Sequence, residues 1–209
     1  MATFTVTNNN DSGDGSLRQA ILAANATSEA DTITFASGLG TIRLASPLTI
    51  TSSLTIDGDL DNDGFEDITI SGDANNNGLN DAEDVRLFSI ATTSGSVVLD
   101  GLNLTGGRAQ GVTGAPGTGN GGGGGFGGAL FIEDVGSLTV RNSTFTNNTA
   151  IGGNGASGQS GFNGGVGGGS TQSLALKLAP PLTSAQGDRK AYLPSPSKAI
   201  LEQVLECEP

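Results

Sequence analysis

The sequence predicts an all-β solenoid, in which short strands stack coil upon coil. Strand-type runs with alternating apolar residues recur along the chain between Gly, Asn and Asp turns. Residues 97–107 (VVLDGLNLTGG) align without gaps on residues 138–148 (LTVRNSTFTNN), and residues 53–58 (SLTIDG) fit the start of the same frame. Such repetition of short strands joined by Gly and Asn turns is typical of solenoids.

A flat antiparallel sandwich is the competing fold. Sandwiches usually contain more aromatic residues than this chain, which is 4% aromatic. The turn residues Asn142, Asn147 and Asn148 favour stacked coils, because Asn tolerates a left-handed turn and its amide can form ladders between neighbouring strands.

The individual elements follow from local patterns. Ser16 and Gln19 have the spacing of a capping box, and Leu17, Ile21 and Leu22 are predicted to share one face of a helix over residues 16–26. Strands are predicted at residues 3–7, 32–35, 41–44, 48–51, 53–57, 67–71, 85–90, 96–105, 129–133 and 137–146.

Residues 57–84 contain two acidic loops, each with a glycine at its sixth position: the first loop (residues 59–70) and the second loop (residues 73–84). Calcium prefers six to eight oxygen ligands, and a twelve-residue loop supplies them from positions 1, 3, 5, 7, 9 and 12, with the backbone carbonyl acting at position 7. The second loop has every position, whereas the first has Ile70 at position 12. The run from Asp59 to Ile68 instead resembles the calcium hairpins of FG-GAP repeats, which close the shell with the position-9 Asp.

Two bound Ca²⁺ ions are therefore predicted. Polar turns without metal are the alternative, since Asp, Asn and Gly dominate turns. Calcium is favoured because ten of the 21 acidic residues fall within residues 57–84, and like charges repel. The candidate ligands are Asp59, Asp61, Asp63, the Phe65 carbonyl and Asp67 in the first loop, and Asp73, Asn75, Asn77, the Leu79 carbonyl, Asp81 and Asp84 in the second.

Composition excludes several function classes. A net charge of −12 argues against nucleic acid and anionic membrane surfaces as partners, and no apolar run is long enough for membrane insertion. The absence of His excludes a His general base and His-ligated zinc or haem, and the lone Cys207 excludes an internal disulfide. No signal peptide is visible, yet such calcium loops work where free calcium is high. An extracellular or cell-surface location, reached by an unknown route, is expected.

The C-terminal half is compositionally different. Residues 105–170 contain 24 of the 35 glycines, so residues 105–128 and 151–170 are expected to be mobile surface loops of a partial solenoid spanning residues 1–170. The composition changes after Gly169, and residues 171–209 are expected to be a non-repeat tail, disordered or foreign to the fold. A short helix is predicted at residues 197–206.

Residues 3–26 (TFTVTNNNDSGDGSLRQAILAANA), followed by ADTITFASG, resemble the N-terminal CSLREA-type motif of bacterial right-handed parallel β-helix proteins. Residues 137–150 (SLTVRNSTFTNNTA) are similar to the coils of the same adhesin-like, pectate-lyase-like group. The resemblance covers residues 2–170 and implies a right-handed parallel β-helix whose open end is capped by a first strand and a helix. Such proteins usually have many coils, whereas this chain offers about three, so a truncated chain is one expectation.

Three functional hypotheses follow. The leading one is a non-catalytic, calcium-binding, adhesin-like module with an unidentified surface glycan or protein partner. A polysaccharide lyase or glycoside hydrolase is the alternative, with Arg86, Arg108 or Arg141 as a candidate base for lyase chemistry. It is disfavoured because an acidic chain repels an anionic polymer and this one has no Trp and a single Tyr for stacking sugars. The third hypothesis is a non-functional truncated remnant.

Overall fold

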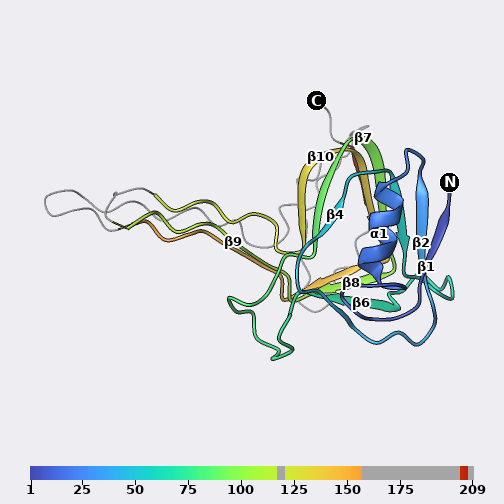
Figure 1. Cartoon of the computed structure of the whole chain (residues 1–209), viewed down its shortest axis with the longest axis horizontal. Helices are drawn as coiled ribbons and strands as arrows, with labels where there is room; N and C mark the ends of the chain where they lie inside the picture. Colours follow the sequence, from blue (N-terminus) through green and yellow to red (C-terminus); the bar gives the residue numbers. More distant parts are fainter. Residues whose placement is uncertain (117–120, 157–202, 207–209) are drawn as a thin grey trace, which may run out of the picture.

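A computed structural model describes residues 1–116, 121–156 and 203–206 (Figure 1). Within them the chain is all-β with a single helix, α1 (Leu17–Asn25). The strands are β1 (Thr3–Val6), β2 (Asp31–Phe35), β3 (Ile42–Arg43), β4 (Leu48–Ile50), β5 (Leu54–Asp57), β6 (Ile68–Ser71), β7 (Phe88–Asp100), β8 (Leu102–Thr105), β9 (Arg108–Gln110), β10 (Leu130–Arg141), β11 (Thr144–Thr146), β12 (Thr149–Ile151) and β13 (Gln203–Glu206).

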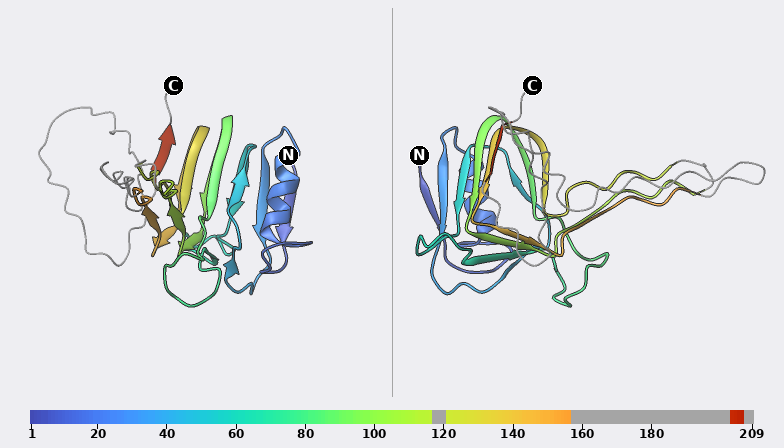
Figure 2. Two further views of the ribbon diagram at one scale, coloured as in Figure 1. Left: turned by 60° about the vertical axis from the view of Figure 1, so that its left-hand side comes forward. Right: turned by 180° about the vertical axis from the view of Figure 1, so that it is seen from behind.

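The strands form three sheets with parallel pairing. The largest has the order β1-β2-β5-β7-β10-β13, with β4 also pairing with β7; the second is β11-β8-β6-β3 and the third is β12-β9. The chain passes from the largest sheet to the second and back, so neighbouring strands come from successive passages (Figure 2). Among the described strands only β13 pairs antiparallel, with β10. The competing prediction of an antiparallel sandwich is therefore wrong.

The residues that the sequence alignment matched are paired in the structure. Leu138 is the register partner of Val97, and Val97 is in turn the partner of Leu54. In the second sheet Phe145 lies opposite Leu104. Apolar residues of successive passages therefore stack on each other, and the buried ones form a single core cluster that runs through the molecule.

Left-handed residues interrupt two of the predicted strands. Residues 96–105 divide into β7 and β8 at Gly101 (φ 61°), and residues 137–146 divide into β10 and β11 near Asn142 (φ 48°). A Cβ at Gly101 would lie 2.6 Å from the carbonyl carbon of Gly58 in the passage below, so two backbones meet there. The buried Asn148 amide also joins passages, donating to the Leu104 carbonyl (2.8 Å) and accepting the Gly107 N–H (2.7 Å).

Helix α1 begins where the sequence predicted. The Ser16 hydroxyl accepts the Gln19 N–H at 3.2 Å, which confirms the N-cap. The Ser16 N–H bonds to the Gly13 carbonyl instead of a Gln19 side chain, so the box is one-sided. Leu17 and Ile21 are buried as predicted, but Leu22 is 56% exposed, because it lies about 100° around the helix from Ile21.

The glycine-rich residues form an arm that leaves the stacked sheets (Figure 1). We call residues 108–114, 121–128 and 149–154 the three segments of the glycine arm. Strands β9 and β12 pair at its base, within residues that were predicted to be mobile loops or turns. Residues 117–120 and 157–170, also predicted to be loops, lie outside the described residues.

Residues 171–202 and 207–209 of the predicted tail likewise lie outside the described residues. The predicted helix over residues 197–206 is wrong at residues 203–206, which form β13. A helix this short is marginal in water, whereas the edge of β10 offers backbone partners that satisfy the same groups.

Candidate metal centre

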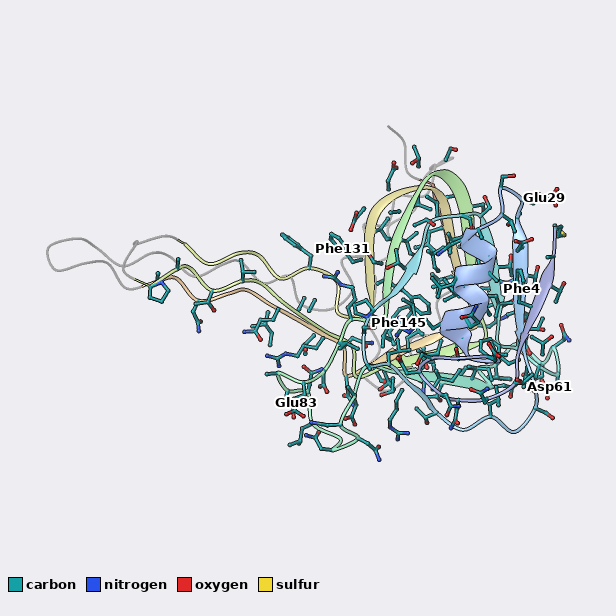
Figure 3. The ribbon with its side chains drawn as sticks, in the orientation of Figure 1. Phe4, Glu29, Asp61, Glu83, Phe131 and Phe145 are labelled. Atoms are coloured by element: carbon teal, nitrogen blue, oxygen red, sulfur yellow. The ribbon has the colours of Figure 1, made fainter. Side chains whose placement is uncertain are left out.

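The two acidic loops replace tight corners of the stack. The first follows β5 and is closed by the Asp67 N–H bonding to the Gly58 carbonyl at 3.3 Å. The second follows β6 and is closed by the Val85 N–H bonding to the Gly72 carbonyl at 3.0 Å. Strand β6 separates them, and Figure 3 shows Asp61 and Glu83 far apart, on opposite sides of the lower part of the molecule. Charge repulsion therefore acts mainly within each loop.

Both loops share a set of hydrogen bonds from their own backbone N–H groups to their own side-chain oxygens. The position-1 carboxylate accepts the N–H groups of positions 5 and 6, at 3.1 and 3.0 Å in the first loop and 3.0 and 2.9 Å in the second. Position 3 accepts the N–H of position 5 at 3.2 and 3.1 Å, and position 5 accepts that of position 7 at 2.9 and 2.7 Å. Positions 4 and 6 have positive φ in both: Asn62 (58°), Gly64 (82°), Asn76 (57°) and Gly78 (73°). The side-chain oxygens at positions 1, 3 and 5 are thus held by the same backbone N–H groups in both loops.

In the first loop, three carboxylates converge. Oxygens of Asp59, Asp61 and Asp67 all lie within 4.8 Å of one another, and Asp59 is buried. Ligands of one calcium ion lie 2.3–2.6 Å from it, so this spacing fits a shared ion. Ile70, at position 12, is buried in the core and contributes no oxygen. The first loop therefore offers a compact carboxylate set closed by position 9.

In the second loop, amides approach the position-9 carboxylate. Asp81 Oδ2 accepts hydrogen bonds from the side-chain amides of Asn77 (2.6 Å) and Asn75 (3.3 Å). The Asn77 hydrogen bond is the largest cause of the lowered pKa of Asp81. Asp81 is thus held ionised, beside the amides that the ligand pattern places at positions 3 and 5.

Asp84, at position 12, is the least satisfied group of the second loop. Its side chain is buried, with the residue 8% exposed; Oδ2 accepts the Asp81 N–H at 2.9 Å, while Oδ1 has no hydrogen-bond partner. Burial, together with the nearby Asp81 and Asp73 carboxylates, raises the pKa of Asp84. A buried oxygen without a partner is costly, and a cation would relieve both that cost and the repulsion. The second loop therefore offers a buried oxygen that a cation could satisfy, but its carboxylates do not converge as those of the first loop do.

The position-7 residues expose their side chains. Phe65 is 50% exposed and Leu79 is 66% exposed, although both are apolar. The ligand pattern needs only their backbone carbonyls, so their exposure is consistent with the predicted role.

The three arginines considered for lyase chemistry have structural partners. Arg141 binds the Asp100 carboxylate at 2.7–2.8 Å. Arg86 lies over the Phe131 ring at 4.4 Å, and burial lowers the pKa of its guanidinium. Arg108 donates to the Asn80 carbonyl at 3.2 Å and to Gln110 Oε1 at 2.8 Å.

Position 8 of each loop has a role that the ligand pattern did not reveal. Glu66 accepts a hydrogen bond from the Thr144 hydroxyl at 3.4 Å, and Asn80 bonds to Asn147 and Thr149. Both residues thus contact the segment that contains β11 and β12, which lies 67 to 78 residues later in the sequence. Their side chains were missed because calcium loops place no ligand at position 8, so no local signal marks them.

No family model, curated protein or solved structure matches the chain. In the part of the chain that the structure describes, no helix is both long enough and apolar enough to cross a membrane.

Proposed function

We propose that the chain is a right-handed parallel β-helix that binds two calcium ions and acts as a non-catalytic, adhesin-like module, secreted or at a cell surface. The observation that carries the proposal is the repeated loop geometry: two segments share one pattern of side-chain oxygens bonded to the loop's own N–H groups, and three carboxylates of the first loop converge. The parallel stacking of successive passages supports the β-helix. The unpartnered Asp84 oxygen supports a cation in the second loop.

Calcium would neutralise carboxylates that otherwise repel one another, and would join both ends of each loop. Because such an ion binds the folded loops and not the unfolded chain, it stabilises the fold by mass action. The residues that would hold it are Asp59, Asp61, Asp63, Asp67 and the Phe65 carbonyl in the first loop, and Asp73, Asn75, Asn77, Asp81, Asp84 and the Leu79 carbonyl in the second.

The polysaccharide lyase alternative gains no support from the arginines. Each one is engaged with a carboxylate, a ring or backbone carbonyls, which suits a structural role. Turnover of pectate, alginate or a neutral glycan by the full chain would nevertheless overturn the non-catalytic assignment.

Calorimetric titration of the full chain with CaCl₂ tests the proposal directly. We expect saturable binding of about two ions, and a higher melting temperature in calcium than in chelator. Magnesium is the control, because it demands a stricter octahedral shell and dehydrates reluctantly. Absence of heat together with identical melting in calcium and in chelator would reduce both loops to ordinary acidic turns.

A further inference from the structure

The glycine arm is built by close backbone contact among its three segments. The N–H of Gly111 bonds to the Ile151 carbonyl (2.8 Å), that of Gly153 to the Gly123 carbonyl (2.8 Å), and that of Gly123 to the Val112 carbonyl (2.7 Å). Each segment therefore donates to one neighbour and accepts from the other. A Cβ on Gly111, Gly122, Gly125 or Gly153 would collide with a carbonyl of an adjacent segment. The β9–β12 pairing and these bonds hold the three segments together. The arm projects away from the core, so its attachment to the stacked sheets is at its base (Figure 1).

Residues 80–86, which include the last two ligands of the second loop, contact all three segments at that base. The Asn80 carbonyl and the Val85 carbonyl accept hydrogen bonds from Arg108 of the first segment, at 3.2 and 3.0 Å. Arg86 donates to the Gly127 and Phe126 carbonyls of the second segment, at 2.9 and 2.8 Å.

The third segment is held by the same stretch. The Asn80 amide donates to the Asn147 carbonyl at 3.1 Å, just before β12, and its side-chain oxygen pairs with the Thr149 hydroxyl. Asn80 therefore joins two segments by itself, and it is adjacent in sequence to the position-9 ligand Asp81.

We infer that the second loop is a calcium-dependent clamp on the glycine arm, in which Asn80 and Arg86 transmit the state of the loop to the three segments. The inference rests on the proposed calcium binding. Without an ion, the buried Asp84 Oδ1 in the stretch that holds the arm has no hydrogen-bond partner, and the other carboxylates of the loop carry like charge, which is costly. With an ion joining positions 1 and 12, opening of the arm base must also release calcium.

The first loop provides an internal control. Its position-8 residue, Glu66, accepts a hydrogen bond from Thr144 of β11, which lies outside the three arm segments. Calcium in the first loop is therefore expected to stabilise the stack without holding the arm.

Amide hydrogen exchange of the full chain, measured with and without calcium, tests the clamp. Exchange of the arm amides of Gly111, Gly123 and Gly153 is expected to slow by up to ~100-fold when free calcium is 100 times the dissociation constant of the second loop, because opening is then opposed by the full binding equilibrium. Asp84→Asn should abolish most of this slowing, whereas Asp67→Asn in the first loop should preserve it.

Asn80→Ala separates the clamp from the metal site. The side chain is not a predicted ligand, so calorimetry should still give about two ions, while the calcium-dependent slowing of arm exchange should fall at least tenfold. Two bound ions with arm exchange independent of calcium in the unaltered chain would overturn the clamp and leave the calcium proposal standing. No binding by calorimetry would overturn both. An Asn80→Ala chain that keeps the full effect would show that Asn80 does not transmit it.

Discussion

Replacing Asp84 with Asn tests two effects separately: the destabilisation by a buried carboxylate when calcium is absent, and the stabilisation that a bound calcium ion would give. The carboxylate is buried, one of its oxygens has no partner, and the Asp81 and Asp73 carboxylates lie near enough to raise its pKa further. An amide has the same shape without the charge. In chelator at neutral pH, Asp84→Asn is therefore expected to melt no lower than the unaltered chain.

The expected calcium effect has a definite size. At free calcium 100 times the dissociation constant, one site contributes about 2.7 kcal/mol to the free energy of unfolding. For a domain of this size, each kcal/mol shifts the melting temperature by roughly 2–4 °C. Each occupied loop should thus raise it by about 5–11 °C. Asp84→Asn should keep the increment of the first loop and lose that of the second.

The dependence on pH follows from the direction of the pKa shift. A carboxyl whose pKa is raised on folding favours the folded state when protonated, and this contribution is lost as pH rises from the ordinary value of 3.8 through the raised one. In chelator, the stability advantage of Asp84→Asn should therefore shrink as pH falls towards 4. In calcium the ionised form is the ligand, so the calcium increment should grow as pH rises over the same range.

Differential scanning calorimetry in calcium and in chelator provides the measurement. Asp14→Asn is the matched control, because it removes an exposed carboxylate outside both loops. If Asp84→Asn gains as much from calcium as the unaltered chain, Asp84 is not a ligand and the reasoning from its unpartnered oxygen is wrong.

The remaining predictions concern the scaffold. Ser16→Ala removes the N-cap bond of α1 and should cost about 1 kcal/mol in urea unfolding; a loss under 0.3 kcal/mol would contradict the cap. Arg141→Ala leaves the buried Asp100 carboxylate, which is paired with Asp57 in the sheet register, without its cation, so the melting temperature should fall; an unchanged melting temperature would contradict the pairing. Leu99→Ala, in the fully buried core, should cost about 2–5 kcal/mol in urea unfolding, whereas exposed Leu22→Ala should cost under 1 kcal/mol.

The parallel stacking could be predicted because its signal is local and repeated. Val97 and Leu138 lie in strands with the same apolar alternation, so aligning their sequences also aligns their registers. The corners could not be placed as well. Gly101 takes a left-handed conformation, as only some of the described glycines do, and nothing adjacent in sequence distinguishes it from the others. The collision that excludes a side chain there comes from Gly58, 43 residues earlier.

In the candidate site, too, local sequence patterns could be predicted, whereas contacts between distant residues could not. The fixed spacing of oxygen-bearing residues marks the two loops, and residues at positions 1, 3 and 5 of each accept hydrogen bonds from the loop's own N–H groups. The roles of Asn80 and Glu66 depend on strands that lie far along the chain, so only the folded structure reveals them. Strand β13 was misassigned for a related reason: its partner, β10, precedes it by about 65 residues.

The two loops, although alike in backbone, differ in how ready they are for an ion. In the first, three carboxylate oxygens already converge, so binding requires little rearrangement, and four carboxylates supply charge. In the second, the amides of Asn77 and Asn75 donate hydrogen bonds to Asp81 Oδ2, so an ion that binds this oxygen must displace them. Asp84 Oδ1 has no hydrogen-bond partner. Affinity in such loops depends on ligand charge and site rigidity, and both favour the first loop. The second loop is also the one attached to the arm. Calcium is therefore expected to stabilise the stack at lower concentrations than those at which it holds the arm, which would let one ion serve the fold and the other control the part that projects from it.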